Sequence, residues 1–187
     1  MIIAVIPAKK SSTRLPNKNM QEISGKPLIY YSIKIAQDSK YIDDIYVSTD
    51  SNKIGDYSKS LQCHPIKRKD ELCNSTAPVL GVYLDVLEQI SDPSIEYIIG
   101  IQPDHPDRTI NIDEVIAYAI KKNWDQLITT DADGLKNGSL WIMKVEALKN
   151  GLIGHGSVGT YKDGCTNIHY KEDLEVARKN IINKGMN

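Results

Sequence analysis

Short apolar runs rich in β-branched residues alternate along this chain with longer segments that suit helices. The first run spans residues 2–6, and further runs follow at 45–48, 97–101, 126–130 and 140–143. A continuous apolar run of this length is typical of a strand that is buried on both faces of a sheet. Strands that alternate with helices predict an α/β fold with a mainly parallel sheet.

The segments between these runs have helical features. Helices are predicted over 26–37, about 52–60, 77–90, 112–122 and 171–183. Pro27 suits the start of the first helix, and Thr49-Asp50-Ser51 supplies capping side chains ahead of the second. The last helix is expected to begin near Tyr170, and the glycine-rich stretch 151–164 is interpreted as a mobile loop. Linkers and repeats are absent from the sequence, so residues 1–187 are predicted to form a single domain.

Composition excludes several classes of function. Lys plus Arg number 23 and Asp plus Glu number 24, which gives a formal net charge of −1. Nucleic-acid binders and polybasic membrane anchors need a large positive excess, and no apolar run approaches the roughly 20 residues of a membrane span. The N-terminus lacks the basic and apolar regions of a signal peptide. Cys63, Cys73 and Cys165 are odd in number and scattered, which argues against disulfides or a zinc site and favours a cytoplasmic protein with reduced thiols.

The segment after the first predicted strand is the strongest candidate for ligand binding, because ligands of parallel α/β sheets bind at the carboxyl ends of strands. It is dense in cations and hydroxyl side chains, namely Lys9, Lys10, Ser11, Ser12, Thr13, Arg14 and Lys18. Such a loop can direct N–H groups and positive charges at a polyphosphate. From the residues alone, a solvated basic loop is an equally good interpretation. The glycines of a Walker loop or a dinucleotide fingerprint are missing, which argues against a nicotinamide oxidoreductase.

Two stretches resemble the N-terminal signature of the CMP-sugar synthetases, the cytidylyltransferases that activate sialic acids and the eight-carbon sugar acid Kdo. Residues 3–19 read IAVIPAKKSSTRLPNKN, and residues 25–29 read GKPLI. The family pattern is approximately I-P-A-R-x-x-S-x-R-L-P-x-K-N and then G-K-P-L-I. Lys9 stands where the family usually has Arg, which keeps the charge but loses bidentate geometry, and Ser11 stands where Gly is common. The resemblance implies catalytic roles for Lys9, Arg14 and Lys18, a ribose contact for Asn19, and further nucleotide contacts from Ala8, Lys10, Ser11 and Ser12.

Two further segments resemble the nucleotide and metal sites of that family. Residues 68–77 are similar to R-P-x-E-L-A-x-D-x-A, which implies that Arg68 and Ala77 border the base; taken alone, Arg68 would be interpreted as a surface charge. Residues 101–108 combine the L-Q-P-T-S-P-L-R of sialic-acid-type members with the Q-G-D-E-P of Kdo-type members. The combination implies that Gln102 lines the base site and that Asp104 binds Mg²⁺, the expected cofactor. A hard carboxylate at a strand end suits Mg²⁺ beside phosphates; the alternative is that Asp104 and Asp107 shape a proline-rich turn.

Two C-terminal segments extend the likeness. Residues 137–142 resemble the N-G-x-x-Y-I strand of the family, although Asn137-Gly138 is also a general turn signal. Residues 166–174 resemble D-I-D-x-x-x-D-L, whose acidic residues help to bind metal. Asn167 and His169 stand in those two places and are secondary candidates as metal ligands, because neutral side chains bind Mg²⁺ less well than carboxylates. We interpret His169 first as a structural residue, with a hydrogen bond to a phosphate or hydroxyl as the alternative.

The resemblance implies a Rossmann-like three-layer α/β sandwich of the nucleotide-diphospho-sugar transferase type. It also implies transfer of CMP from CTP to an anionic sugar acid, with release of pyrophosphate. Typical members carry a longer insertion between Q-P-T-S-P and N-G-x-x-Y, which supplies much of the sugar pocket and the dimer contact. Here the corresponding stretch holds only a helix and a strand, so either the acceptor is smaller or another subunit, as in a homodimer, completes the pocket. The alternatives are a cytidylyltransferase for a small phosphate or phosphonate, and a nucleotide-binding homologue without catalysis.

Overall fold

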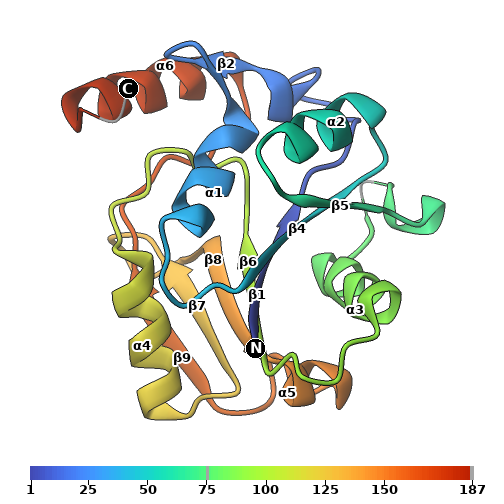
Figure 1. Ribbon diagram of the computed structural model, residues 1–187. Helices are drawn as coiled ribbons and strands as arrows, with labels where there is room; N and C mark the ends of the chain where they lie inside the picture. The colour runs from blue at the N-terminus through green and yellow to red at the C-terminus, as the bar shows by residue number, and fades with distance from the viewer. Residues whose placement is uncertain (75, 186–187) are drawn as a thin grey trace.

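The computed structural model describes residues 1–74 and 76–185, which form a seven-stranded sheet between layers of helices (Figure 1). The strand order is β5-β4-β1-β6-β8-β7-β9. These strands are β1 (Ile2–Pro7), β4 (Asp44–Thr49), β5 (His64–Lys67), β6 (Tyr97–Ile101), β7 (Gln126–Thr130), β8 (Lys136–Lys144) and β9 (Val158–Lys162). The helices are α1 (Leu28–Gln37), α2 (Asn52–Ser60), α3 (Val79–Ile90), α4 (Ile112–Lys122), α5 (Val145–Lys149) and α6 (Lys171–Asn183). A hairpin of β2 (Glu22–Ile23) and β3 (Lys26–Pro27) and the 3-10 turns η1 (Lys18–Met20) and η2 (Asp70–Leu72) complete the fold.

The centre of the sheet is parallel. Ala4 of β1 pairs with Ile45 of β4 on one side and with Ile99 of β6 on the other, and both pairings are parallel. Only β8 departs from this direction, because it runs antiparallel to both β6 and β7. The prediction of a mainly parallel sheet is confirmed, and the loops that follow β1, β4 and β6 meet at one edge of the sheet.

Alternate residues of β1 contact opposite layers of helices. Ala4 and Ile6 belong to the core that contains α1, α2 and α4, whereas Ile3 and Val5 belong to the core that contains α3 and α5. All four side chains are fully buried, as expected for a strand covered on both faces. Helices on both faces of one sheet confirm the predicted three-layer α/β sandwich (Figure 1).

A third core joins the C-terminal helix to the start of the chain. Ile181 of α6 packs with Ile23 of the β2–β3 hairpin, and the two elements lie side by side in Figure 1. Helix α6 begins after Tyr170, as predicted, and the Asp173 carboxylate accepts the backbone N–H groups of His169 and Tyr170. This capping interaction fixes the segment that leads into α6.

Several features differ from the sequence-based expectations. Helix α1 begins at Leu28 and not at residue 26, because Lys26–Pro27 pair with β2 as β3. Strands β5 and β9 and helix α5 are additional elements, so the stretch 151–164 is a strand in part rather than a mobile loop throughout. Within β9, a Cβ on Gly159 would lie 2.0 Å from the ring of Trp124, so this glycine permits close packing. Strand β8 begins at Lys136, and Gly138 lies inside it with φ of +69°, so the turn interpretation is wrong. Strand β5 contains Pro65, which the edge of a sheet tolerates.

Composition predicts neither a membrane span nor a disulfide. No helix in residues 1–74 and 76–185 combines the length and the hydropathy needed to cross a bilayer. Cys63, Cys73 and Cys165 are all free thiols. Burial raises the pKa of Cys63 to about 11 and that of Cys165 to about 12, so both thiols stay protonated at neutral pH.

Candidate active site

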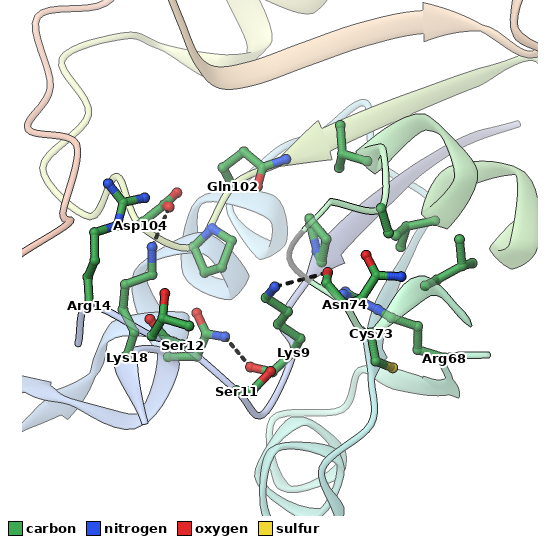
Figure 2. Close-up of a pocket in the computed structure, with 18 of the residues that line it drawn as sticks. Lys9, Ser11, Ser12, Arg14, Lys18, Arg68, Cys73, Asn74, Gln102 and Asp104 are labelled. Carbon is green, nitrogen blue, oxygen red and sulfur yellow. Dashed lines mark hydrogen bonds and ion pairs between the residues drawn. The ribbon is translucent and has the colours of Figure 1, made fainter. Parts of the chain in front are cut away.

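A cavity of about 410 Å³ opens where β1 and β6 end. Three segments far apart in the sequence line it: the loop after β1, the segment that leads into α3, and the loop after β6 (Figure 2). Its charged lining side chains are Lys9, Arg14, Lys18, Arg68 and Asp104. The described wall therefore carries four cations and one carboxylate, which is a charge balance suited to a polyanionic ligand.

Side-chain hydrogen bonds shape the loop after β1. Asn19 donates its Nδ2 to the carbonyl oxygen of Lys9 at 2.9 Å and so ties the two ends of the loop together. Asn17 adopts a left-handed conformation with φ of 53°, which Asn tolerates, and turns the chain into η1. Lys9 donates its Nζ to the carbonyl oxygen of Asn74 at 3.2 Å and thereby reaches the second lining segment (Figure 2).

Arg68 is buried, with only 4% of its surface exposed. Its Nε donates to the Ser48 hydroxyl at 3.1 Å, and its Nη2 donates to the Ser48 carbonyl oxygen at 2.9 Å. Burial lowers the pKa of Arg68, while Cys73 and Asp50 act against that shift. The guanidinium is still charged at neutral pH, because its pKa starts above 12. Arg68 is therefore a fixed cation in the cavity wall, and its interpretation as a surface charge is wrong.

Asp104 follows β6 and forms an ion pair with the loop after β1. Lys18 Nζ lies 2.7 Å from Oδ2 of Asp104, and His105 Nδ1 lies 3.1 Å from Oδ1. Burial acts to raise the pKa of Asp104, but His105 and Lys18 outweigh burial and leave the pKa well below its ordinary value. Asp104 is therefore an anion at neutral pH. The turn-forming role fits Asp107, whose buried carboxylate accepts hydrogen bonds from Thr166.

A buried tyrosine orients Gln102 in the cavity wall. Gln102 Nε2 donates to the hydroxyl of Tyr83 at 3.1 Å, and Tyr83 is fully buried on α3. The hydroxyl occupies the space over Gly100, where a Cβ would lie 2.2 Å from Tyr83 Oη. Sequence reasoning missed Tyr83, because its position in α3 is that of any core residue. The available signal was Gly100, a glycine inside a buried strand.

The surroundings of Asp104 fit a divalent cation that is bound together with phosphates. Within the described parts of the chain, no cluster of three His, Cys, Asp or Glu side chains could hold an ion by itself. Asp104 Oδ1 is buried and accepts no well-aligned hydrogen bond in those parts, although His105 Nδ1 lies 3.1 Å from it. Mg²⁺ commonly takes one or two carboxylates with substrate phosphates. His169 lines the same cavity and Asn167 does not. Burial, together with Arg14 and Lys18, lowers the pKa of His169 and keeps its imidazole neutral at neutral pH.

The structure brings most of the predicted site residues into one cavity wall: Lys9, Ser11, Ser12, Arg14, Lys18, Asn19, Arg68, Ala77, Gln102, Asp104 and His169. Three predicted residues lie elsewhere. Ala8 is fully buried beneath the loop, where its N–H donates to the Ser48 carbonyl oxygen. Lys10 lines a separate, smaller hollow, and its N–H donates to Asp50. Asn167 also lies outside the wall, whereas His169, two residues further on, lines the cavity.

Sequence reasoning also missed the apolar part of the wall. It consists of side chains from η2 and the first turns of α3, namely Leu72, Val79 and Val82, with Cys73 and Asn74 beside them. The helical spacing of the two valines predicted only that they face the core. Their approach to the cavity depends on how α3 is placed against the loop after β1, which local spacing does not report.

The family model for cytidylyltransferases matches residues 3–147. The chain belongs to the cytidylyltransferase family. A CMP-N,N'-diacetyllegionaminic acid synthase of Legionella pneumophila is 36% identical over 126 residues, which cover 64% of this chain and 52% of that protein. A 3-deoxy-manno-octulosonate cytidylyltransferase of Francisella tularensis is 32% identical over 120 residues, which cover 64% of this chain and 46% of that protein. The chain thus spans about half the length of these two cytidylyltransferases.

Solved structures share the fold of this cytidylyltransferase domain. A CMP:2-keto-3-deoxy-manno-octonic acid synthetase complexed with CTP has a TM-score of 0.79 at 15% identity and covers 98% of this chain and 99% of its own. A putative glucose-1-phosphate thymidylyltransferase from Bacillus anthracis has a TM-score of 0.70 at 11% identity, covering 96% and 94%. This likeness confirms the predicted Rossmann-like α/β architecture of nucleotidyltransferases.

Proposed function

We propose that this chain transfers CMP from CTP to an anionic sugar acid and releases pyrophosphate. The observation that carries the proposal is the charge balance of the cavity wall, where Lys9, Arg14, Lys18 and Arg68 accompany one carboxylate, that of Asp104. Charge-assisted hydrogen bonds from such cations suit a triphosphate. Membership of the cytidylyltransferase family supports cytidine as the base, and the names of the relatives support a sugar acid as the acceptor.

In the proposed reaction, an acceptor oxygen attacks the α-phosphorus of CTP. The bond between that phosphorus and the oxygen that bridges to the β-phosphate breaks, and pyrophosphate leaves with the electron pair. The chain supplies no nucleophile. Lys9, Arg14 and Lys18 would hold the phosphates in line and neutralise the charge that develops on the leaving group. Arg68 would contact the nucleotide without a change in its side-chain conformation, since Ser48 already holds its guanidinium.

Asp104 would hold Mg²⁺ against the phosphates, with His169 and Asn167 as secondary candidates. When bound, the metal would supply further neutralisation of phosphate charge. The buried Oδ1, which accepts no well-aligned hydrogen bond, and the depressed pKa of Asp104 support this part of the proposal. EDTA is expected to abolish turnover, and added Mg²⁺ is expected to restore it.

The proposal includes a homodimer in which the second subunit completes the acceptor pocket, because only α4 and β7 lie between the loop after β6 and β8 in the described chain. It also includes a cytoplasmic location, which three free thiols favour. Light scattering on purified protein, with and without CTP, would measure the mass of the particle and reject the dimer if only monomer is found.

Pyrophosphate release with CTP and a panel of acceptors tests the proposed reaction. We expect sugar acids to react and phosphomonoesters and phosphonates to be inert; the reverse pattern would replace the sugar acid by a small phosphate or phosphonate. CTP binding without turnover on any acceptor would support the non-catalytic homologue instead. Lys9→Met is expected to lower kcat/KM about 10- to 100-fold. Lys121→Met on α4 removes the same charge outside the cavity wall and serves as the matched control.

A further inference from the structure

The ammonium group of Lys18 occupies a place suited to a metal ion. Its Nζ lies 2.7 Å from Oδ2 of Asp104, as Figure 2 shows, and 3.1 Å from the carbonyl oxygen of Ile168. A carboxylate and a backbone carbonyl are the oxygen ligands that hard divalent cations prefer. The Lys18 and Asp104 side chains are only 17% and 20% exposed, so solvent screens this pair weakly.

The backbone fixes these three groups relative to one another. The N–H of Ile168 donates to the carbonyl oxygen of Asp104 at 2.9 Å, which joins the two segments that supply oxygens to Lys18. Lys18 itself begins η1 directly after the left-handed turn at Asn17, and Asn19 anchors the same turn to Lys9. The chain's own hydrogen bonds therefore hold both oxygens around Lys18.

We propose that Lys18 is the resident cation of the Asp104 site, and that a divalent metal gains Asp104 only after nucleotide phosphates have drawn the ammonium away. The inference rests on the proposed function, because that function assigns the phosphates to this cavity. It makes Lys18 a positioning residue for the metal as well as a phosphate ligand. The order of events that follows is nucleotide first or nucleotide and metal together, and never metal alone.

The charges around Asp104 explain why metal alone binds poorly. Among the described residues, Asp104 is the only carboxylate in the wall, and Lys18 neutralises it. Arg14 lines the same cavity and adds a further positive charge that repels a second cation. Phosphates reverse this balance, because they attract Lys18 and Arg14 and present new oxygens to the metal.

Binding of Mn²⁺ to the nucleotide-free protein, measured by the loss of the free-ion signal in electron paramagnetic resonance, tests the inference. Wild-type protein is expected to bind Mn²⁺ weakly. Lys18→Met removes the ammonium from Oδ2 of Asp104 and leaves His105 beside Oδ1, and this variant is expected to bind Mn²⁺ at least about tenfold more tightly. The double variant Lys18→Met with Asp104→Asn is expected to return to wild-type binding, and Lys121→Met is expected to match wild type throughout.

Two outcomes would overturn the inference: equal Mn²⁺ affinity in wild type and Lys18→Met, or a gain that persists in the double variant. Lys18→Gln provides a second test if the methionine variant does not fold, because its amide keeps a hydrogen bond to Asp104 without the charge. Circular dichroism establishes that each variant is folded. The assay contains neither CTP nor acceptor, so a failure of CMP transfer in wild type is a separate result that counts against the proposed function alone.

Discussion

Gly100→Ala would force the hydroxyl of Tyr83 out of its place beside Gln102. The new Cβ would lie 2.2 Å from Tyr83 Oη and 2.6 Å from its Cζ, so the ring must move by about 1 Å to regain ordinary contact. Tyr83 is fully buried and cannot move without displacing neighbours, which costs about 1–3 kcal/mol. Loss of its hydrogen bond with Gln102 adds about 1 kcal/mol. We expect the free energy of unfolding to fall by about 2–4 kcal/mol in total.

Urea denaturation followed by fluorescence measures this loss, and a thermal scan should show a Tm lower by roughly 5–15 °C. Gly55→Ala is the matched control. Gly55 lies inside helix α2, and a Cβ there would meet Pro65 at 3.6 Å, an ordinary contact. The control is expected to stabilise the protein by about 0.5–1 kcal/mol, since alanine favours a helix interior.

Measurement of CTP binding tests whether the packing of Tyr83 against Gly100 affects the candidate site. Displacing Tyr83 would release Gln102 from its fixed orientation, so we expect Gly100→Ala to weaken CTP binding in isothermal titration and Gly55→Ala to leave it unchanged. In a Tyr83→Phe background the contact at 2.2 Å is gone and the contact to Cζ is kept, so the cost of Gly100→Ala should fall without vanishing. Wild-type stability in Gly100→Ala, or a cost that Tyr83→Phe does not reduce, would refute the packing argument.

Three further predictions follow from the same structure. Arg68→Lys should weaken CTP binding about tenfold, because lysine cannot reproduce both bonds of the buried guanidinium; unchanged affinity in calorimetry would remove Arg68 from the site. In thiol labelling at pH 8, Cys73 should react before Cys63 and Cys165, whose pKa values are about 11 and about 12, and CTP should protect Cys73 because it lines the cavity; labelling that CTP does not slow would contradict the proposed location. Hydrogen bonds from the backbone and side chain of Ser157 lower the pKa of Asp125 in the folded protein. The ionised Asp125 therefore stabilises the fold fully above its unfolded pKa of about 3.9, and this contribution is lost as pH falls through the lower pKa of the folded state. Denaturation should therefore show Asp125→Asn less stable than wild type at pH 7 and the two proteins converging towards pH 2; a constant difference would show that the charge plays no part.

Local signals in the sequence were sufficient for several elements. Helix α2 begins where its capping residues predict, since Ser51 accepts the N–H of Ile54. Helix α4 has the predicted bounds, and Asn111, for which no cap was predicted, accepts the N–H of Asp113. The buried runs of β6 and β7 have the predicted bounds. The edge strands β5 and β9 carry no comparable local signal in the sequence. In β9, Gly159 pairs with Leu127 of β7 and lies against the ring of Trp124, and both partners come from outside the strand.

The candidate site likewise combines features that the sequence predicts with features that only the fold determines. Order along the chain and the residue types of the loop after β1 were sufficient to identify Lys9, Arg14 and Lys18 as one cationic group, since these residues are neighbours in sequence. Only the tertiary structure decided that Lys18 is paired with Asp104, 86 positions away, and that Arg68 is buried rather than exposed. The physical reason is that the charge, burial and orientation of these groups depend on atoms brought close by the sheet, whereas helix caps and strand periodicity depend on residues a few positions apart.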